Sequence, residues 1–173
     1  NRILIGSENN AYKGGVHLYE RSGAAFNLLT TITNPIFSGS AKFGNFITRF
    51  GDDQFAVGNN AGKSVANGGV FLYAWNGGAP ILQGLVTNMA TFAISSMGTN
   101  GLVVGDMTAS KVHLYDWTGA LLSPLTTLTN PTAKTLGRYG SSVAGLSINR
   151  LVVGAEFNDF GGDAFLHEWN GVE

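Results

Sequence analysis

Residues 138–171 read RYGSSVAGLSINRLVVGAEFNDFGGDAFLHEWNG, and this stretch decides the fold. It contains three short runs of mainly apolar residues, separated by polar segments that are rich in glycine. The first run opens on an aromatic residue followed by glycine, the second ends in glycine, and the third is closed by Asn-Gly. The same order of runs recurs, with changed residues, three times nearer the N terminus. An internal repeat of this kind has to be identified before individual elements are assigned.

The repeated unit has four runs, which we number from first to fourth. The second run, apolar and ending in glycine, recurs every 47 to 52 residues, at 3–6, 55–58, 102–105 and 151–154. The third run follows at 16–20, 70–74, 112–116 and 164–168, and each copy is soon closed by a turn pair such as Ser22-Gly23 or Asn76-Gly77. Such pairs tolerate positive φ and are typical of β-hairpins.

The other two runs complete the unit. The fourth is rich in threonine and occupies 29–35, 125–131 and, more loosely, 85–88. The first opens at Phe43-Gly44, Phe92-Ala93 and Tyr139-Gly140. No segment has a sustained apolar period of 3.6, whereas short β-branched and aromatic runs recur throughout. The sequence therefore predicts an all-β chain.

Four-stranded antiparallel units that repeat every 40 to 50 residues are typical of a β-propeller, whose blades pack face to face. The second runs are apolar at successive residues, as expected for strands covered on both faces. A β-sandwich or a β-solenoid would explain the four-run period less directly. We expect one propeller domain over 1–173, or part of one, with repeats at approximately 1–42, 43–91, 92–138 and 139–173.

The order of the motifs resembles the FG-GAP repeat of the integrin α-subunit propeller. It is more similar still to the shorter bacterial version of that repeat, found in tandem in surface and secreted proteins. The best match is Tyr139-Gly140 followed by Leu-Val-Val-Gly-Ala at 151–155, and Phe43-Gly44 with Gly-Gly-Val-Phe-Leu-Tyr at 68–73 comes next. The resemblance spans the chain, although the third copy departs from it with Ala93 and with Asp106 after Gly105.

The runs add up to fourteen strands, or about 3.5 blades, because the first repeat lacks its first strand and the last repeat lacks its fourth. The resemblance implies a ring that usually has seven blades. Three arrangements stay open: a piece of a longer propeller, a ring assembled from two or more chains, and a distorted four-bladed monomer. An incomplete propeller exposes sheet faces and edges. We therefore expect self-association or a neighbouring chain that covers them.

Composition and charge narrow the function classes. A net charge of −1 gives no basic patch for nucleic acid or an anionic membrane, and no run of 18 apolar residues predicts a membrane span. The absence of cysteine excludes a disulfide framework and a thiolate nucleophile. No Gly-x-Ser-x-Gly turn and no nucleotide-binding glycine loop are present. We expect a chain that is not an enzyme and needs no cofactor. Because it begins at Asn1 without Met, we interpret it as processed or partial.

Calcium is the one metal that the resemblance suggests, because integrin-type repeats often carry an Asp-rich loop between the first and second strands. The loops at 51–54, 98–101 and 145–149 lack three spaced acids. A better set of oxygen ligands is Glu156, Asp159 and Asp163, together with Asn158, in the last loop between the second and third strands. The same residues are also typical of a solvated turn.

Histidine and tryptophan occupy repeated positions. His17 and His113 align with Phe71 and Phe165, and His167 aligns with three tyrosines, so we expect packing roles and no metal site. The tryptophans Trp75, Trp117 and Trp169 share one slot, which Arg21 fills in the first repeat. That slot favours packing at the blade edge, with a stacking platform for a sugar or a side chain as the alternative.

The loops between the second and third strands are the longest and most variable, so we predict the ligand-binding surface there. The candidate ligand-binding residues are Asn9, Tyr12, Lys13, Asn60, Lys63, Asp106, Asn158 and Asp159. The sequence favours a non-catalytic binding or adhesion module of the surface or extracellular type, which recognises a protein or a glycan. A structural subunit of a homo-oligomeric or filamentous assembly, and a lectin with or without calcium, are the alternatives.

Overall fold

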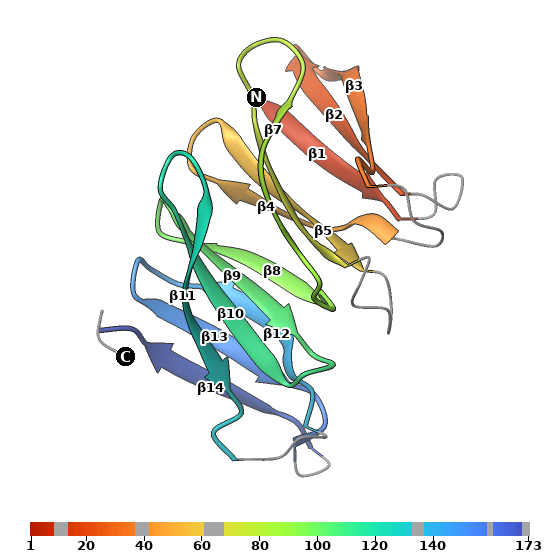
Figure 1. The fold of residues 1–173 in the computed structure, drawn as a ribbon. Helices are drawn as coiled ribbons and strands as arrows, with labels where there is room; N and C mark the ends of the chain where they lie inside the picture. The colour runs from red at the N-terminus through yellow and green to blue at the C-terminus, as the bar shows by residue number, and fades with distance from the viewer. Residues whose placement is uncertain (9–13, 37–41, 61–67, 133–136, 159–160, 171–173) are drawn as a thin grey trace.

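All regular secondary structure in the described part of the chain is β-strand, apart from a single 3-10 position (Figure 1). The computed structural model of the chain describes residues 1–8, 14–36, 42–60, 68–132, 137–158 and 161–170. These residues contain fourteen strands in four antiparallel sheets. The all-β prediction and the predicted number of strands are confirmed.

Each sheet is a simple meander, in which strands adjacent in sequence are adjacent in space. Sheet 1 contains β1 (Arg2–Ser7), β2 (Gly15–Ser22) and β3 (Ala25–Thr33). Sheet 2 contains β4 (Lys42–Phe50), β5 (Gln54–Asn60), β6 (Gly69–Ala74) and β7 (Ile81–Thr87). Sheet 3 contains β8 (Ala93–Met97), β9 (Gly101–Asp106), β10 (Lys111–Trp117) and β11 (Leu122–Thr129). Sheet 4 contains β12 (Tyr139–Gly145), β13 (Arg150–Ala155) and β14 (Asp163–Glu168).

The sheets are blades of the β-propeller type, and they follow one another from the N terminus to the C terminus (Figure 1). The first strands of neighbouring blades, β4, β8 and β12, lie side by side, and β1 lies next to β4. Sheets 2 and 3 are complete four-stranded blades. Sheet 1 lacks a first strand and sheet 4 lacks a fourth, as the repeat predicts.

Three apolar layers fill the spaces between the four sheets, and they contain most of the buried side chains of the described residues. The layer between sheets 1 and 2 is aromatic, with Phe43 edge-on to Phe71 and Phe55 stacked on Tyr73. The layer between sheets 2 and 3 joins Leu72 and Val70 to Leu102 and Val104. The layer between sheets 3 and 4 is built from the following residues: Val103, Leu114, Tyr139, Leu151 and Val153.

Glycine lets neighbouring sheets approach closely at two of these layers. Gly44 and Gly140, the second residues of the aromatic–glycine pairs, both have φ of +89° in the β-bulges that open β4 and β12. A β-carbon on Gly105 would overlap the carbonyl oxygen of Gly140, and one on Gly6 would overlap that of Gly44. Only glycine fits at such a backbone approach.

The third repeat solves the same packing problem differently. Ala93 replaces the glycine of the pair, and β8 pairs with β9 without a bulge. A β-carbon on Gly58 would meet the side chains of Phe46 and Thr91 at 3.0 and 3.3 Å instead of a carbonyl group. The departure of this repeat from the sequence pattern therefore has a structural counterpart.

The glycine at the bulge of β12 can be tested against a glycine of nearly identical backbone. Gly140→Ala and Gly119→Ala both place alanine at positive φ, which costs about 1–2 kcal/mol. Only at Gly140 does the new β-carbon meet backbone, 2.6 Å from the carbonyl oxygen of Lys111, whereas nothing lies within 4 Å at Gly119. Urea unfolding should show a further loss of about 1–3 kcal/mol for Gly140→Ala. Equal losses for the two variants would contradict the close-approach explanation.

Candidate functional site

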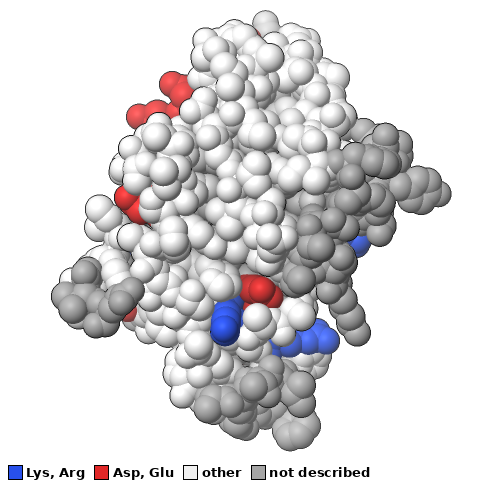
Figure 2. Space-filling model, in the orientation of Figure 1, with Lys and Arg blue, Asp and Glu red and all other residues white. Residues whose placement is uncertain are grey.

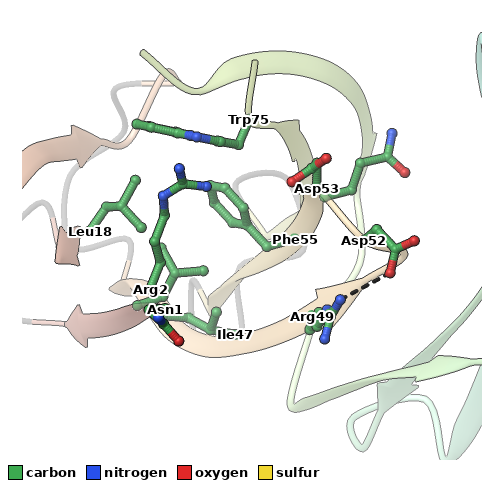
Figure 3. A pocket seen from close by; sticks show the side chains of 11 residues that line it. Asn1, Arg2, Leu18, Ile47, Arg49, Asp52, Asp53, Phe55 and Trp75 are labelled. Atoms are coloured by element: carbon green, nitrogen blue, oxygen red, sulfur yellow. Dashed lines mark hydrogen bonds and ion pairs between the residues drawn. The ribbon is translucent and has the colours of Figure 1, made fainter. Parts of the chain in front are cut away.

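One end of the blades carries the turns between the first and second strands and those between the third and fourth strands. Two adjoining cavities lie at this end. The first cavity, about 460 Å³, lies between sheets 1 and 2 (Figure 3). The second, about 520 Å³, lies between sheets 2 and 3. Both are lined by Arg49, Asp52 and Gln54 of the β4–β5 hairpin. We call the two cavities together the turn-end groove.

The floor of the first cavity is apolar. Leu4 and Leu18 come from sheet 1, and Ile47 and Phe55 come from sheet 2. Phe55 belongs to the aromatic layer between these sheets, and Leu4 and Ile47 pack against that layer. The strands that carry them are fixed by their ladders, so the floor is preformed and can receive the aliphatic part of a side chain.

Arg2 and Trp75 form one wall of this cavity. The guanidinium carbon of Arg2 lies 4.6 Å from the centroid of the Trp75 ring, a cation–π contact, and Nε of Arg2 donates to Glu20 at 3.2 Å. The backbone N–H of Trp75 donates to the carbonyl of Asp53 at 2.7 Å, which ties the indole to the β4–β5 turn. In Figure 3 the Arg2 side chain extends from its strand toward the indole.

The rim of the groove is charged. Nη2 of Arg49 lies 3.1 Å from Oδ1 of Asp52, and both side chains are largely exposed. Asp53 follows at the tip of the same turn. An exposed ion pair contributes only about 0–1 kcal/mol, so an incoming cation can compete with Arg49 for the carboxylates at little cost. The groove therefore combines an apolar floor with a rim that carries two carboxylates and the guanidinium of Arg49.

This groove was not among the sequence predictions, which placed the ligand-binding surface at the opposite end of the blades. Asp52-Asp53 and the tryptophan slot are both visible in the sequence. Their meeting with Arg2 is set by the packing of one repeat on the next, which no pattern within a single repeat encodes. Charged side chains are sparse on the face drawn in Figure 2, and acidic ones gather at its left edge.

The predicted loop residues divide into two groups. Asn9, Tyr12, Lys13, Lys63 and Asp159 lie outside the described residues. The described ones, Asn60, Asp106 and Asn158, are buried. The hypothesis that this end binds a ligand stays a prediction.

The described loop residues hold their own loops. Oδ1 of Asp106 accepts from the backbone N–H of Ala109 at 2.9 Å. The side chain of Asn158 accepts from Thr132 at 3.0 Å and donates to the carboxylate of Asp163. These contacts order the backbone of the loops, which is a common role of short polar side chains.

Glu156 and Asp163, two of the predicted metal ligands, border the loop between β13 and β14. Glu156 forms an ion pair with Arg138, whose guanidinium covers the ring of Phe157 at 4.3 Å, and Asp163 accepts from Asn158. Within the described ranges, no three histidine or acidic side chains gather in a way that could hold a metal ion. Asp159 lies outside those ranges, so the calcium hypothesis stays a prediction.

Each histidine pairs with a hydroxyl group inside its own sheet. Nδ1 of His17 lies 2.9 Å from the Thr31 hydroxyl, and Nδ1 of His113 lies 3.0 Å from that of Thr127. Nε2 of His167 lies 2.7 Å from the Tyr139 hydroxyl. Burial lowers the pKa of His113 and of His167 below the ordinary value of 6.5. Burial also raises the pKa of Tyr139, and that of Tyr73 to about 12. The imidazoles of His113 and His167 are therefore packed as neutral groups.

The lowered pKa of His167 predicts a loss of stability in mild acid. Above pH 6.5 the imidazole is neutral in both states, and below it the unfolded chain binds the proton first, so the free energy of unfolding falls. His167→Gln keeps a hydrogen-bonding group for Tyr139 but does not titrate. Thermal unfolding between pH 7.5 and 5 should show a smaller acid-induced loss for the variant, and a smaller one again when His113→Gln is added. An unchanged pH profile would contradict the neutral packing of these side chains.

Comparisons with known proteins identify no family. No family model matches the sequence, and no curated protein matches it. Among solved structures, the chain is similar to the structure of YCF48 bound to D1 peptide, with a TM-score of 0.46 and 11% identity over 91% of this chain. The chain spans 50% of the length of that protein. Similarity at this level supports no inference about ligand or function. In the part of the chain that the structure describes, no helix is long and apolar enough to cross a membrane.

Proposed function

We propose that this chain is a non-catalytic binding module of the surface or extracellular type, which recognises a protein partner through the turn-end groove. The observation that carries the proposal is the first cavity, where an apolar floor lies beneath a wall of Arg2 and Trp75 and a charged rim that includes Asp52 and Asp53. Arginine and tryptophan are enriched at the energetic centres of protein interfaces. The surface or extracellular setting is inferred from the FG-GAP resemblance, and no cofactor is required.

The chemistry of the groove favours a long basic side chain as the anchor of the partner. The aliphatic stem of a lysine or arginine fits the floor formed by Leu18 and Phe55, and its cationic head reaches the carboxylates of Asp52 and Asp53. Long side chains commonly bury their stem while the charge stays at the surface. Arg49 balances the rim, so that the groove favours a single cation and is not a generally acidic patch.

A glycan is the alternative ligand, and Trp75 is the reason to test it. Sugars stack on open aromatic faces, but the Arg2 guanidinium already covers one face of this indole. We therefore place the protein partner first. The loops at the opposite end, which include Tyr12 and Lys13, form a second predicted surface whose ligand the same screen would reveal.

The test is a screen of a random-sequence peptide library displayed on phage, with a glycan array beside it. Selected peptides should share a lysine or arginine next to an apolar residue. The double variant Asp52→Asn/Asp53→Asn should bind them about tenfold more weakly, and Asp116→Asn, an acid at the same end but outside both cavities, should bind as the parent chain does. The proposal fails if no peptide is selected, if the double variant binds equally, or if only glycans bind.

A further inference from the structure

The two outermost sheets each have one open face. On sheet 1 this is the face turned away from sheet 2, and on sheet 4 it is the face turned away from sheet 3. Residues directly opposite in an antiparallel ladder share a face, so Ile3, Tyr19 and Leu28 belong together on sheet 1. Ile5 and His17 extend this face along the same strands. We call it the front face.

The open face of sheet 4, which we call the back face, has a different composition. Val152 and Leu166 lie opposite each other, next to the Gly154–Ala164 pair. Leu166 is 66% exposed and Val152 is half-buried. The back face therefore presents one large side chain among small ones, whereas the front face presents mainly large ones.

The repeat shows what normally covers the front face. In the other three sheets, the repeat position of Ile5 is occupied by Val57, Val104 and Val153. Each of these side chains is 0% exposed because the preceding sheet packs on it. Ile5 itself is 48% exposed. The difference lies in the missing neighbour and not in the residue type, since all four side chains are β-branched and apolar.

The back face is covered in the same way within the chain. The slot of Leu166 is held by Leu18, Leu72 and Leu114, which are 3%, 0% and 1% exposed. Leu72 packs in one layer with Val104, and Leu114 packs in one layer with Val153. The layers between sheets 2 and 3 and between sheets 3 and 4 thus each join the repeat position of Leu166 on one sheet to the repeat position of Ile5 on the next.

We infer that a second copy of this chain docks head to tail, with the back face of sheet 4 of one copy on the front face of sheet 1 of the next. This contact would repeat the packing already present between sheets 2 and 3 and between sheets 3 and 4. A contact between two different faces is heterologous, so it produces a closed ring or a filament, depending on the rotation per copy.

Shape favours this pairing over two identical faces meeting. In the layer between sheets 2 and 3, small Ala56 from one sheet packs in the same layer as large Tyr115 and Trp117 from the other. The back face offers Val152 at the repeat position of Ala56, beside the small pair Gly154 and Ala164, and the front face offers Tyr19 at the repeat position of Tyr115. Two front faces would set large side chains against large ones, which leaves gaps or strain in a packed layer.

Charged residues would also meet at the edge of the two faces. On the back face, Arg150 and Glu168 form an ion pair at 3.1 Å. The same pair in sheet 1, Arg2 and Glu20, lies beside Trp75 of the next sheet. In a docked copy the exposed Arg21 would occupy the repeat position of Trp75, so its guanidinium would lie beside the Arg150–Glu168 ion pair, in which Glu168 supplies the opposite charge. Charged groups of this kind at the rim fix the register in which two apolar faces meet.

The test compares Ile5→Lys, which blocks the front face, with Leu166→Lys, which blocks the back face. Sedimentation velocity over a concentration series should show association of the parent chain and only monomers for each variant alone. An equimolar mixture of the two variants should form a dimer, because one retains a working back face and the other a working front face. Leu121→Lys, a change of the same kind at an exposed turn residue, should associate as the parent chain does.

Three results would overturn the inference. The first is a parent chain that stays monomeric at every concentration, and the second is a mixture that stays monomeric. The third is a Leu166→Lys variant that associates alone, since that would mean that front faces pair with each other. Ile5 is 48% exposed and Leu166 is 66% exposed in the single chain, so the variants keep the buried layers intact, and circular dichroism with thermal unfolding would verify their fold.

Discussion

The close approach of one sheet to the next is the constraint on which the rest of this structure depends. At two of the three layers, a glycine that ends a second strand lies against the carbonyl of a bulged glycine in the following blade, Gly6 against Gly44 and Gly105 against Gly140. Removing the side chain at this point lets the large apolar residues beside it interdigitate at the density of a protein interior. The aromatic–glycine pairs and the glycine-terminated runs are thus two halves of one contact.

A further consequence is that every sheet has two unlike faces, so the stack has a direction. At the second and third strands of sheet 2, one face carries the aromatic residues Phe55, Phe71 and Tyr73, and the other carries the aliphatic residues Ala56, Val70 and Leu72. Within the described residues, the outer faces of sheets 1 and 4 are left uncovered, and they are the two unlike kinds of face. The turn-end groove arises where the apolar layer between sheets 1 and 2 ends in polar turn residues beneath Arg2 and Trp75.

Local patterns predicted the strands and the blades, because the positions of strands and turns depend mainly on residues that are adjacent in the sequence. The four runs of the unit, the turns at Gly23, Gly77 and Gly119, and the incomplete first and last blades all followed from the repeat. The groove did not follow, because Arg2 and Trp75 lie in different repeats and meet only through sheet packing. The polar residues of the loops were equally hard to interpret from the sequence. Asn158 was predicted to bind a ligand, but its side chain is buried and hydrogen-bonded within its own loop.

Hydrogen–deuterium exchange resolved by strand tests the central claim, that packing between sheets and not the sheets themselves holds the fold together. In dilute solution we expect the slowest exchange in β5, β6, β9 and β10, which lie inside sheets covered on both faces. We expect faster exchange in β1 and β14, which are edge strands of sheets covered on one face only. Equally slow exchange in all four sheets, or slowest exchange in sheet 1 or sheet 4, would contradict it.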